Sequence, residues 1–141
     1  IIKYMAAGRY SFVIEQGATT DFEIQYKDSN NSPIDLSDYS GRLQIRSTYA
    51  QDSGEIYLTL SSSRNGDGTG LNFSGSNGTT PPTSGSIGIY IAACTSSALT
   101  FNEAVYDLEI YSGSGDCPYT VRLIQGNVRL SKEVTRVWEL L

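Results

Sequence analysis

Short runs in which apolar and polar residues alternate occur along most of the chain. The clearest of them begins at Val105, where Tyr106, Leu108 and Ile110 alternate with polar neighbours. A glycine- and serine-rich turn follows, and the alternation resumes at residue 119. Because a period of two is typical of a strand with one buried face, these runs predict a β-hairpin. The pattern breaks at Gly126 and then continues as a third extended run.

The same period predicts further strands in the rest of the chain. They cover residues 9–15, 20–27, 41–47, 55–61 and 86–92. Leu71 and Phe73 mark one more short strand, and residues 95–102 are expected to form a helical turn. Short strands separated by turns favour an all-β fold, an Ig-like antiparallel β-sandwich of about eight or nine strands.

The chain of 141 residues is expected to form a single domain, since its length suits one core. Residues 1–8 are predicted to be an N-terminal arm, residues 62–86 a flexible Gly/Ser-rich loop, and residues 131–141 a C-terminal tail. Met5 resembles a natural start, which would make residues 1–4 an upstream remnant.

The C-terminal tail carries two competing patterns. Val134, Val137 and Trp138 have the i, i+3, i+4 spacing of an amphipathic helix, so a short C-terminal helix is one prediction. The same residues are β-formers, and an extended tail is the alternative. In either case Trp138 is expected to close the core or to dock on a neighbouring molecule.

Charge and hydropathy limit the partners. The formal net charge of −5 gives no electrostatic reason to expect nucleic acid as a partner. No apolar run reaches the roughly 18 residues that span a bilayer, so no membrane insertion is expected. Cys94 and Cys117 are predicted to be free thiols, buried or half-buried, in preference to a disulfide, because stapled domains usually carry more cysteine.

The residues that could carry catalysis do not form a recognisable set. The chain has no histidine, which excludes a Ser/His/Asp triad and leaves a cysteine nucleophile without an imidazole base. Segments beginning at Asp28 and Asn65 imitate calcium-binding loops, but each lacks the acidic twelfth residue, so turns are favoured over metal sites. Paired acids such as Asp107 and Glu109 lie on one strand face, where ordinary solvation is expected. We therefore expect no enzyme, no cofactor and no metal.

Aromatic residues are the remaining candidates for a binding site. Tyr10, Tyr26, Tyr106 and Tyr119 share faces with aliphatic residues and are expected in the core. By alternation, the tyrosines predicted to point away from the core are Tyr57, Tyr90 and Tyr111. Exposed tyrosines stack on sugars or anchor protein interfaces, whereas packing on a solvated sheet needs no ligand. As interface candidates we take these three tyrosines together with Val134, Val137 and Trp138.

Three segments resemble a known group of proteins. They are YSFVIEQGATTDFEIQYKD, SPIDLSDYSGRLQIR, and the pair VYDLEIYS and TVRLIQGNVRLSKEVTR. Together they resemble small virion proteins of tailed phages, particularly marine and cyanobacterial ones, and the Ig-like N-terminal domains of phage baseplate and receptor-binding proteins. The likeness covers both ends of the chain and skips residues 62–86.

The resemblance implies a non-enzymatic virion structural protein, a tail or baseplate component that supports host attachment through protein–protein interfaces. Its partners would be other virion proteins and further copies of itself, and it would be assembled in the host cytoplasm into the virion. The alternative is a carbohydrate-binding or adhesion module, which would bind a host surface glycan with the exposed tyrosines and the loop that includes Arg64.

Overall fold

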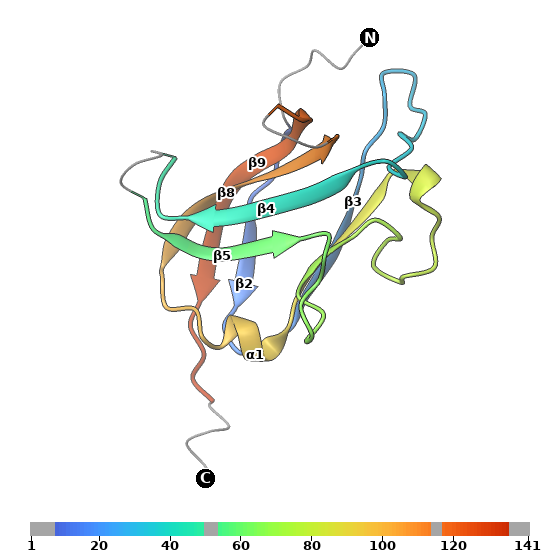
Figure 1. Ribbon diagram of the computed structural model, residues 1–141. Helices are drawn as coiled ribbons and strands as arrows, with labels where there is room; N and C mark the ends of the chain where they lie inside the picture. The colour runs from blue at the N-terminus through green and yellow to red at the C-terminus, as the bar shows by residue number, and fades with distance from the viewer. Residues whose placement is uncertain (1–7, 50–53, 114–116, 136–141) are drawn as a thin grey trace.

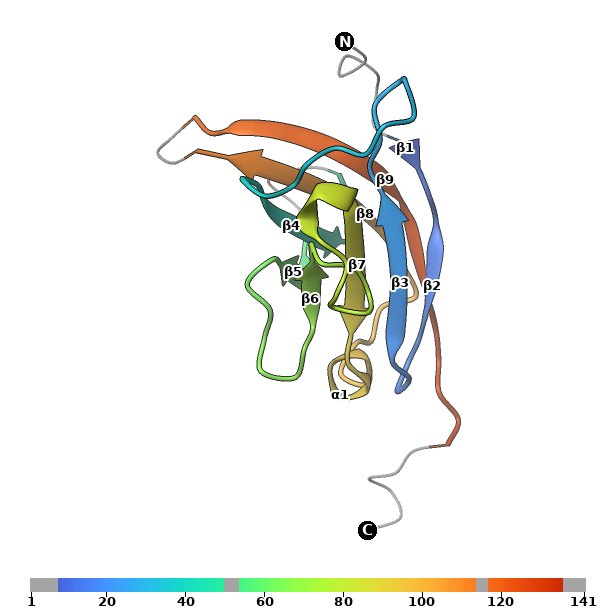
Figure 2. The ribbon, with the colours of Figure 1, turned by 90° about the vertical axis from the view of Figure 1, so that its right-hand side faces the viewer.

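The computed structural model describes residues 8–49, 54–113 and 117–135 as two β-sheets with a hydrophobic core between them (Figures 1 and 2). The described strands are β1 (Gly8–Arg9), β2 (Phe12–Glu15), β3 (Thr20–Gln25), β4 (Ser40–Arg46), β5 (Ile56–Ser61), β6 (Gly70–Asn72), β7 (Ser86–Ile91), β8 (Glu103–Ser112) and β9 (Tyr119–Ser131). The described helical segments are the 3-10 turn η2 (Pro82–Ser84) and the single turn α1 (Ala93–Ser96). The predicted all-β sandwich is confirmed.

Two sheets make up the sandwich. Sheet A has the order β1-β9-β8-β4-β5, with β2 also paired to β9, and sheet B has the order β3-β7-β6. Most neighbouring strands are antiparallel, as predicted, but β1 and β2 run parallel to β9. These strands come from opposite ends of the sequence, so no hairpin turn fixes their relative direction.

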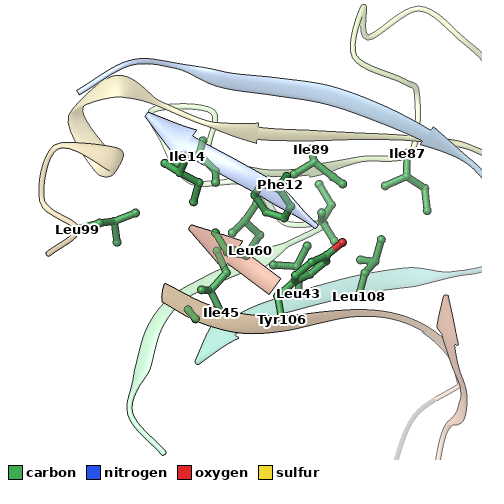
Figure 3. Close-up of a cluster of buried hydrophobic side chains, with 14 of the residues drawn as sticks. Phe12, Ile14, Leu43, Ile45, Leu60, Ile87, Ile89, Leu99, Tyr106 and Leu108 are labelled. Atoms are coloured by element: carbon green, nitrogen blue, oxygen red, sulfur yellow. The ribbon is translucent and has the colours of Figure 1, made fainter. Parts of the chain in front are cut away.

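The inward faces of both sheets meet in one core (Figure 3). Ile14 of β2, Ile45 of β4, Ile87 of β7 and Leu108 of β8 are completely buried. Figure 3 shows side chains of β2 and β7 beside those of β4, β5 and β8. In β2, β4 and β8 the buried positions alternate as the sequence pattern predicted. Burial of these aliphatic side chains holds the sheets together, at about 1.5–3 kcal/mol for each.

A bulge in β9 breaks the predicted alternation three residues earlier than expected. Ile124 pairs with Leu108 and Arg122 with Glu109, so Leu123 is the extra residue between them. Before the bulge the odd-numbered residues of β9, such as Val121, face the core. After it the even-numbered residues Val128 and Leu130 face the core and are buried. The stretch predicted as two runs is therefore one strand.

A second bulge, in β5, corrects the prediction for Tyr57. Arg46 pairs with Ile56 and Ile45 with Leu58, which leaves Tyr57 as the extra residue. The Tyr57 ring packs on Phe101, with centroids 4.7 Å apart, at the edge of the core. Ile56 shares the outward side with Arg46 and is 49% exposed, although alternation placed it inside.

The tyrosines predicted to be in the core divide into two groups. Tyr106 is buried, as expected, and its hydroxyl donates a hydrogen bond of 2.5 Å to the carbonyl of Tyr10. Tyr26 is half-buried. The prediction is wrong for Tyr10 and Tyr119, which are 46% and 54% exposed. The Tyr10 ring nevertheless contacts Phe22 of sheet B, with centroids 5.7 Å apart.

The segment predicted as a flexible loop contains β6 and η2. Leu71 in β6 is buried in the core, which agrees with the predicted short strand. The buried hydroxyl of Thr69 accepts a hydrogen bond from the Ala92 amide and ties the segment to the end of β7. The predicted helical turn is found at α1, two residues earlier than expected.

The C-terminal predictions lie largely beyond the described part of the chain. Strand β9 ends at Ser131, and Val134 is 94% exposed and has no helical backbone. Val137 and Trp138 lie outside the described residues, so the predicted helix stays a prediction. Within the described chain, no helix is both long and apolar enough to cross a membrane.

Candidate functional site

The outer face of sheet A gathers charged side chains from three adjacent strands. Leu43 and Ile45 of β4 point inward, so the alternate residues Arg42 and Arg46 point outward. Across the strands, Arg42 is directly opposite Glu109 of β8, which in turn is opposite Arg122 of β9. The pairing of β8 with β9 places an acid across from Arg122. Basic and acidic residues therefore form a row across the sheet.

These side chains line a groove of about 580 Å³. We call it the arginine groove and define it by Arg42, Arg46, Tyr49, Asp107, Glu109 and Arg122. It contains three arginines and two acids, which gives it a formal charge of +1 in a chain whose net charge is −5. The groove is thus locally positive on an acidic protein.

Arg42 is held in place on two sides. Its Nε lies 2.9 Å from Oε1 of Glu109, and its guanidinium carbon lies 4.6 Å from the centre of the Tyr111 ring. The first contact is an ion pair and the second a cation–π contact. Both ion-pair partners are partly exposed, so the pair contributes less than about 1 kcal/mol to stability. Its main effect is to fix the direction of the guanidinium.

The environment of Asp107 in the arginine groove disfavours its charged carboxylate. Its Oδ2 lies 3.4 Å from Nε of Arg122, a contact that favours the charged carboxylate. Even so, burial raises the pKa of Asp107, and the nearby Glu109 raises it further, against the opposing effect of Arg122. Loss of water therefore outweighs the ion pair, since 3.4 Å is long for a charge-assisted hydrogen bond.

Arg46 is the arginine of the groove whose charge is least satisfied. Its Nε is buried and has no hydrogen-bond partner among the described residues. Arg46 lies close enough to Asp107 to lower the pKa of that carboxyl, but it forms no ion pair with it within the described chain. A guanidinium donates in a planar fork that matches a carboxylate, and Arg46 is only half-buried, so its terminal nitrogens, and not the buried Nε, can bind an acidic group of another molecule.

A second hollow continues the outer face toward the N-terminal strands. It has a volume of about 440 Å³ and is lined by Val13 of β2, Glu103 and Val105 of β8, and Asn127 and Arg129 of β9. Val105 also borders the arginine groove, so the two hollows adjoin. Val13 is 43% exposed and gives this end of the face an apolar element.

The structure places the predicted interface tyrosines on different surfaces. Tyr111 stands beside the arginine groove, where Arg42 covers one face of its ring. Tyr90 lies on the outer face of sheet B, because it pairs with Asp21 across β3 and β7. Tyr57 is part of the edge of the core. The three rings therefore do not form one platform for a ligand.

Tyr90 has its own small hollow on sheet B. This hollow, of about 210 Å³, is also lined by Asp21, Arg64, Asp67 and Asn72. A Cβ added to Gly68 would lie 3.3 Å from the Tyr90 ring, so the loop that precedes β6 passes closely over it. An aromatic ring beside amide and charged groups is an arrangement that can bind a sugar.

In the segments that imitate calcium loops, the aspartate side chain accepts hydrogen bonds from nearby backbone amides. Oδ1 of Asp28 accepts hydrogen bonds from the amides of Asn30 and Ser32, both at 2.9 Å. This geometry is that of an Asx turn, which supports the interpretation as a turn. Among the described residues, no group of three or more His, Cys, Asp or Glu side chains is arranged to hold a metal ion.

Asp67 is the centre of the other such loop. Its Oδ2 accepts a hydrogen bond of 2.6 Å from Thr95, and its Oδ1 accepts one of 2.9 Å from the Thr69 amide. These bonds, that of Thr95 first, lower the pKa of Asp67 to about 2. Cys94 lies at the same place, with Sγ 3.5 Å from Asp67 Oδ2. Cys94 and Cys117 are free, as predicted, but both are exposed instead of buried.

The arginines of the groove are the residues that the search for candidate sites missed. The alternation of β4 already placed Arg42 and Arg46 outward, on either side of Gln44. What the sequence lacked was the order of the strands in the sheet, which brings Arg122 to the same groove.

Comparisons of the chain with protein-family models and with curated proteins found no match.

Proposed function

We propose that the chain is a non-enzymatic structural protein of a tailed-phage virion, a tail or baseplate component that supports host attachment by binding other virion proteins. The observation that carries the binding role is the arginine groove, in which Arg46 has a buried Nε without a partner. The assignment to a virion is supported by the resemblance of the β2–β3, β4 and β8–β9 segments to phage virion proteins.

The chemistry of the groove suits a protein partner. Arginine and tyrosine are enriched in protein interfaces, where they combine a large contact area with directed hydrogen bonds. Glu109 and Tyr111 hold Arg42 in place before any partner arrives, which lowers the entropy lost on binding. A partner carboxylate would enter the groove and accept hydrogen bonds from Arg46.

The acids of the groove do not suit catalysis. Asp107 and Glu109 lie on the same strand, two residues apart, and each is within ion-pair distance of an arginine. A glycosidase instead needs two carboxyl groups that face each other across a cleft. The proposed mechanism is therefore binding without turnover.

The virion assignment is tested on assembled particles. The chain is produced together with the phage genes that surround its own, the particles are purified, and mass spectrometry and immunogold labelling locate it. We expect label on tails or baseplates and loss of label for Arg46→Ala, while Lys132→Ala is incorporated normally. Lys132 is a matched control because it is exposed and lies outside the arginine groove, with its Nζ donating a hydrogen bond to the Thr100 carbonyl. Particles that lack the wild-type chain would contradict the proposal.

The second candidate function is carbohydrate binding, favoured by the hollow at Tyr90. A glycan array probed with the purified chain tests it. Binding that Tyr90→Ala abolishes and Tyr111→Ala spares would support a glycan module centred on sheet B. Under the virion proposal, neither substitution changes glycan binding, because the chain does not recognise glycans itself.

A further inference from the structure

Arg46 and Asp21 carry opposite charges on the two opposite outer faces of the sandwich, so they cannot pair within one molecule. Arg46 lies on the outer face of sheet A, in the arginine groove, with its Nε unpartnered. Asp21 lies on the outer face of sheet B and is exposed, and within the described chain it forms no hydrogen bond or ion pair. The buried core separates the two faces.

The surroundings of the two residues are also complementary. The arginine groove carries a formal charge of +1, as described above. On sheet B, Asp21, Glu23 and Asp67 outweigh Arg64, which leaves this surface at −2. Glu23 and Asp67 are occupied by hydrogen bonds to Ser76 and to Thr95, so Asp21 is the acid of this surface that is free to bind.

The position of β3 makes Asp21 accessible to a second molecule. Strand β3 is an edge strand of sheet B, and its outward residues Asp21, Glu23 and Gln25 are exposed. The side chain of Asp21 is exposed on the outer face of sheet B, where a second molecule can reach it. Acids on an edge strand also prevent unwanted strand pairing, which is the competing explanation for their presence.

We propose that the partner of the arginine groove is a second copy of this chain, which inserts the acidic edge β3 so that its Asp21 pairs with Arg46. This inference rests on the proposed function and specifies one of its interfaces. The contact joins two different surfaces, so it is heterologous and leaves a free groove and a free edge at the ends. Repetition of this contact gives a closed ring or an open filament.

Charge reversal tests the contact. Arg46→Glu and Asp21→Arg are each expected to raise the dissociation constant of self-association at least about tenfold, because each places like charges across the interface. Mixing the two variants is expected to restore association, since the intact groove of one meets the intact edge of the other. Light scattering and analytical ultracentrifugation measure both effects.

Two further variants keep the result interpretable. Arg46→Gln removes the charge without adding an acid beside Asp107, so it guards against misfolding of Arg46→Glu. Asp38→Arg makes the same change as Asp21→Arg at an exposed site outside both surfaces and is expected to associate like wild type. Circular dichroism checks the fold of each variant.

Two results would overturn the inference. If Asp21→Arg associates as the wild type does, the groove binds another surface, and β3 carries its acids only to block strand pairing. If the wild-type chain is a monomer at every concentration and at low salt, no copy binds the groove. The proposed function would survive that second result, because particle labelling tests it separately.

Discussion

At the scale of single residues, Gly126 shows how closely the N-terminal strands approach β9. A Cβ added at Gly126 would lie 2.2 Å from the carbonyl oxygen of Tyr10, a backbone atom that cannot move alone. The same oxygen accepts the hydrogen bond of the Tyr106 hydroxyl. Glycine at this position therefore permits both the passage of the chain and a hydrogen bond that satisfies a buried hydroxyl.

We predict that Gly126→Ala destabilises the protein by about 1–3 kcal/mol, the usual cost of overpacking. The measurement is the free energy of unfolding in urea. Gly66→Ala is the matched control, because a Cβ at Gly66 meets nothing within 4 Å. Equal stabilities of the two variants would show that the β1–β2 segment does not lie on β9 as described.

Asp67 gives the fold a dependence on acid pH. Hydrogen bonds, first that of Thr95, lower its pKa from 3.8 to about 2. A carboxyl whose pKa is lower in the folded state stabilises the fold above its unfolded value, and this contribution disappears as the pH falls through the folded value. We therefore predict that wild type loses stability relative to Asp67→Asn as the pH falls from about 4 to about 2.

Urea denaturation of both proteins at several acidic pH values measures the difference. Thr95→Val removes the largest cause of the low pKa and should move the loss to higher pH. A stability difference that does not change with pH in this window would contradict the hydrogen bonds assigned to Asp67.

At the scale of elements, the strands differ in how far the sequence predicts them. Strand β8 alternates without interruption, and its buried residues Tyr106, Leu108 and Ile110 were all predicted. Strands β5 and β9 each contain a bulge, at Tyr57 and at Leu123. Neither bulge is marked by glycine or proline in the sequence. The position of a bulge depends on the pairing with the partner strand, which the local sequence does not reveal.

The bulge in β5 gives Tyr57 a packing role at the edge of the core. We predict that Tyr57→Ala destabilises the fold by about 1–3 kcal/mol, less than a fully buried aromatic side chain, because it removes the ring that stacks on Phe101. Tyr119→Ala is the control, since Tyr119 is 54% exposed. Unfolding in urea compares the two variants. An unchanged stability of Tyr57→Ala would contradict the packing role of the Tyr57 ring.

At the scale of the whole molecule, the sandwich could be predicted from the sequence and the arginine groove could not. Alternation shows that most strands have one buried face, and two such sheets must cover each other. It predicts the hairpin of β8 and β9, but not that the N-terminal strands pair in parallel with β9 or that β4 lies beside β8. The arginine groove depends on that neighbourhood, because Arg42 and Arg122 are far apart in the sequence.

The central claim is that the outer face of sheet A is the surface by which this chain binds its protein partner. Hydrogen–deuterium exchange, compared between the dilute chain and its assembled form, tests it most directly. We expect slower exchange on assembly in residues 42–49 and 105–111, which border the arginine groove. Unchanged exchange there, with protection confined to the end of the sandwich that carries α1, would contradict the claim.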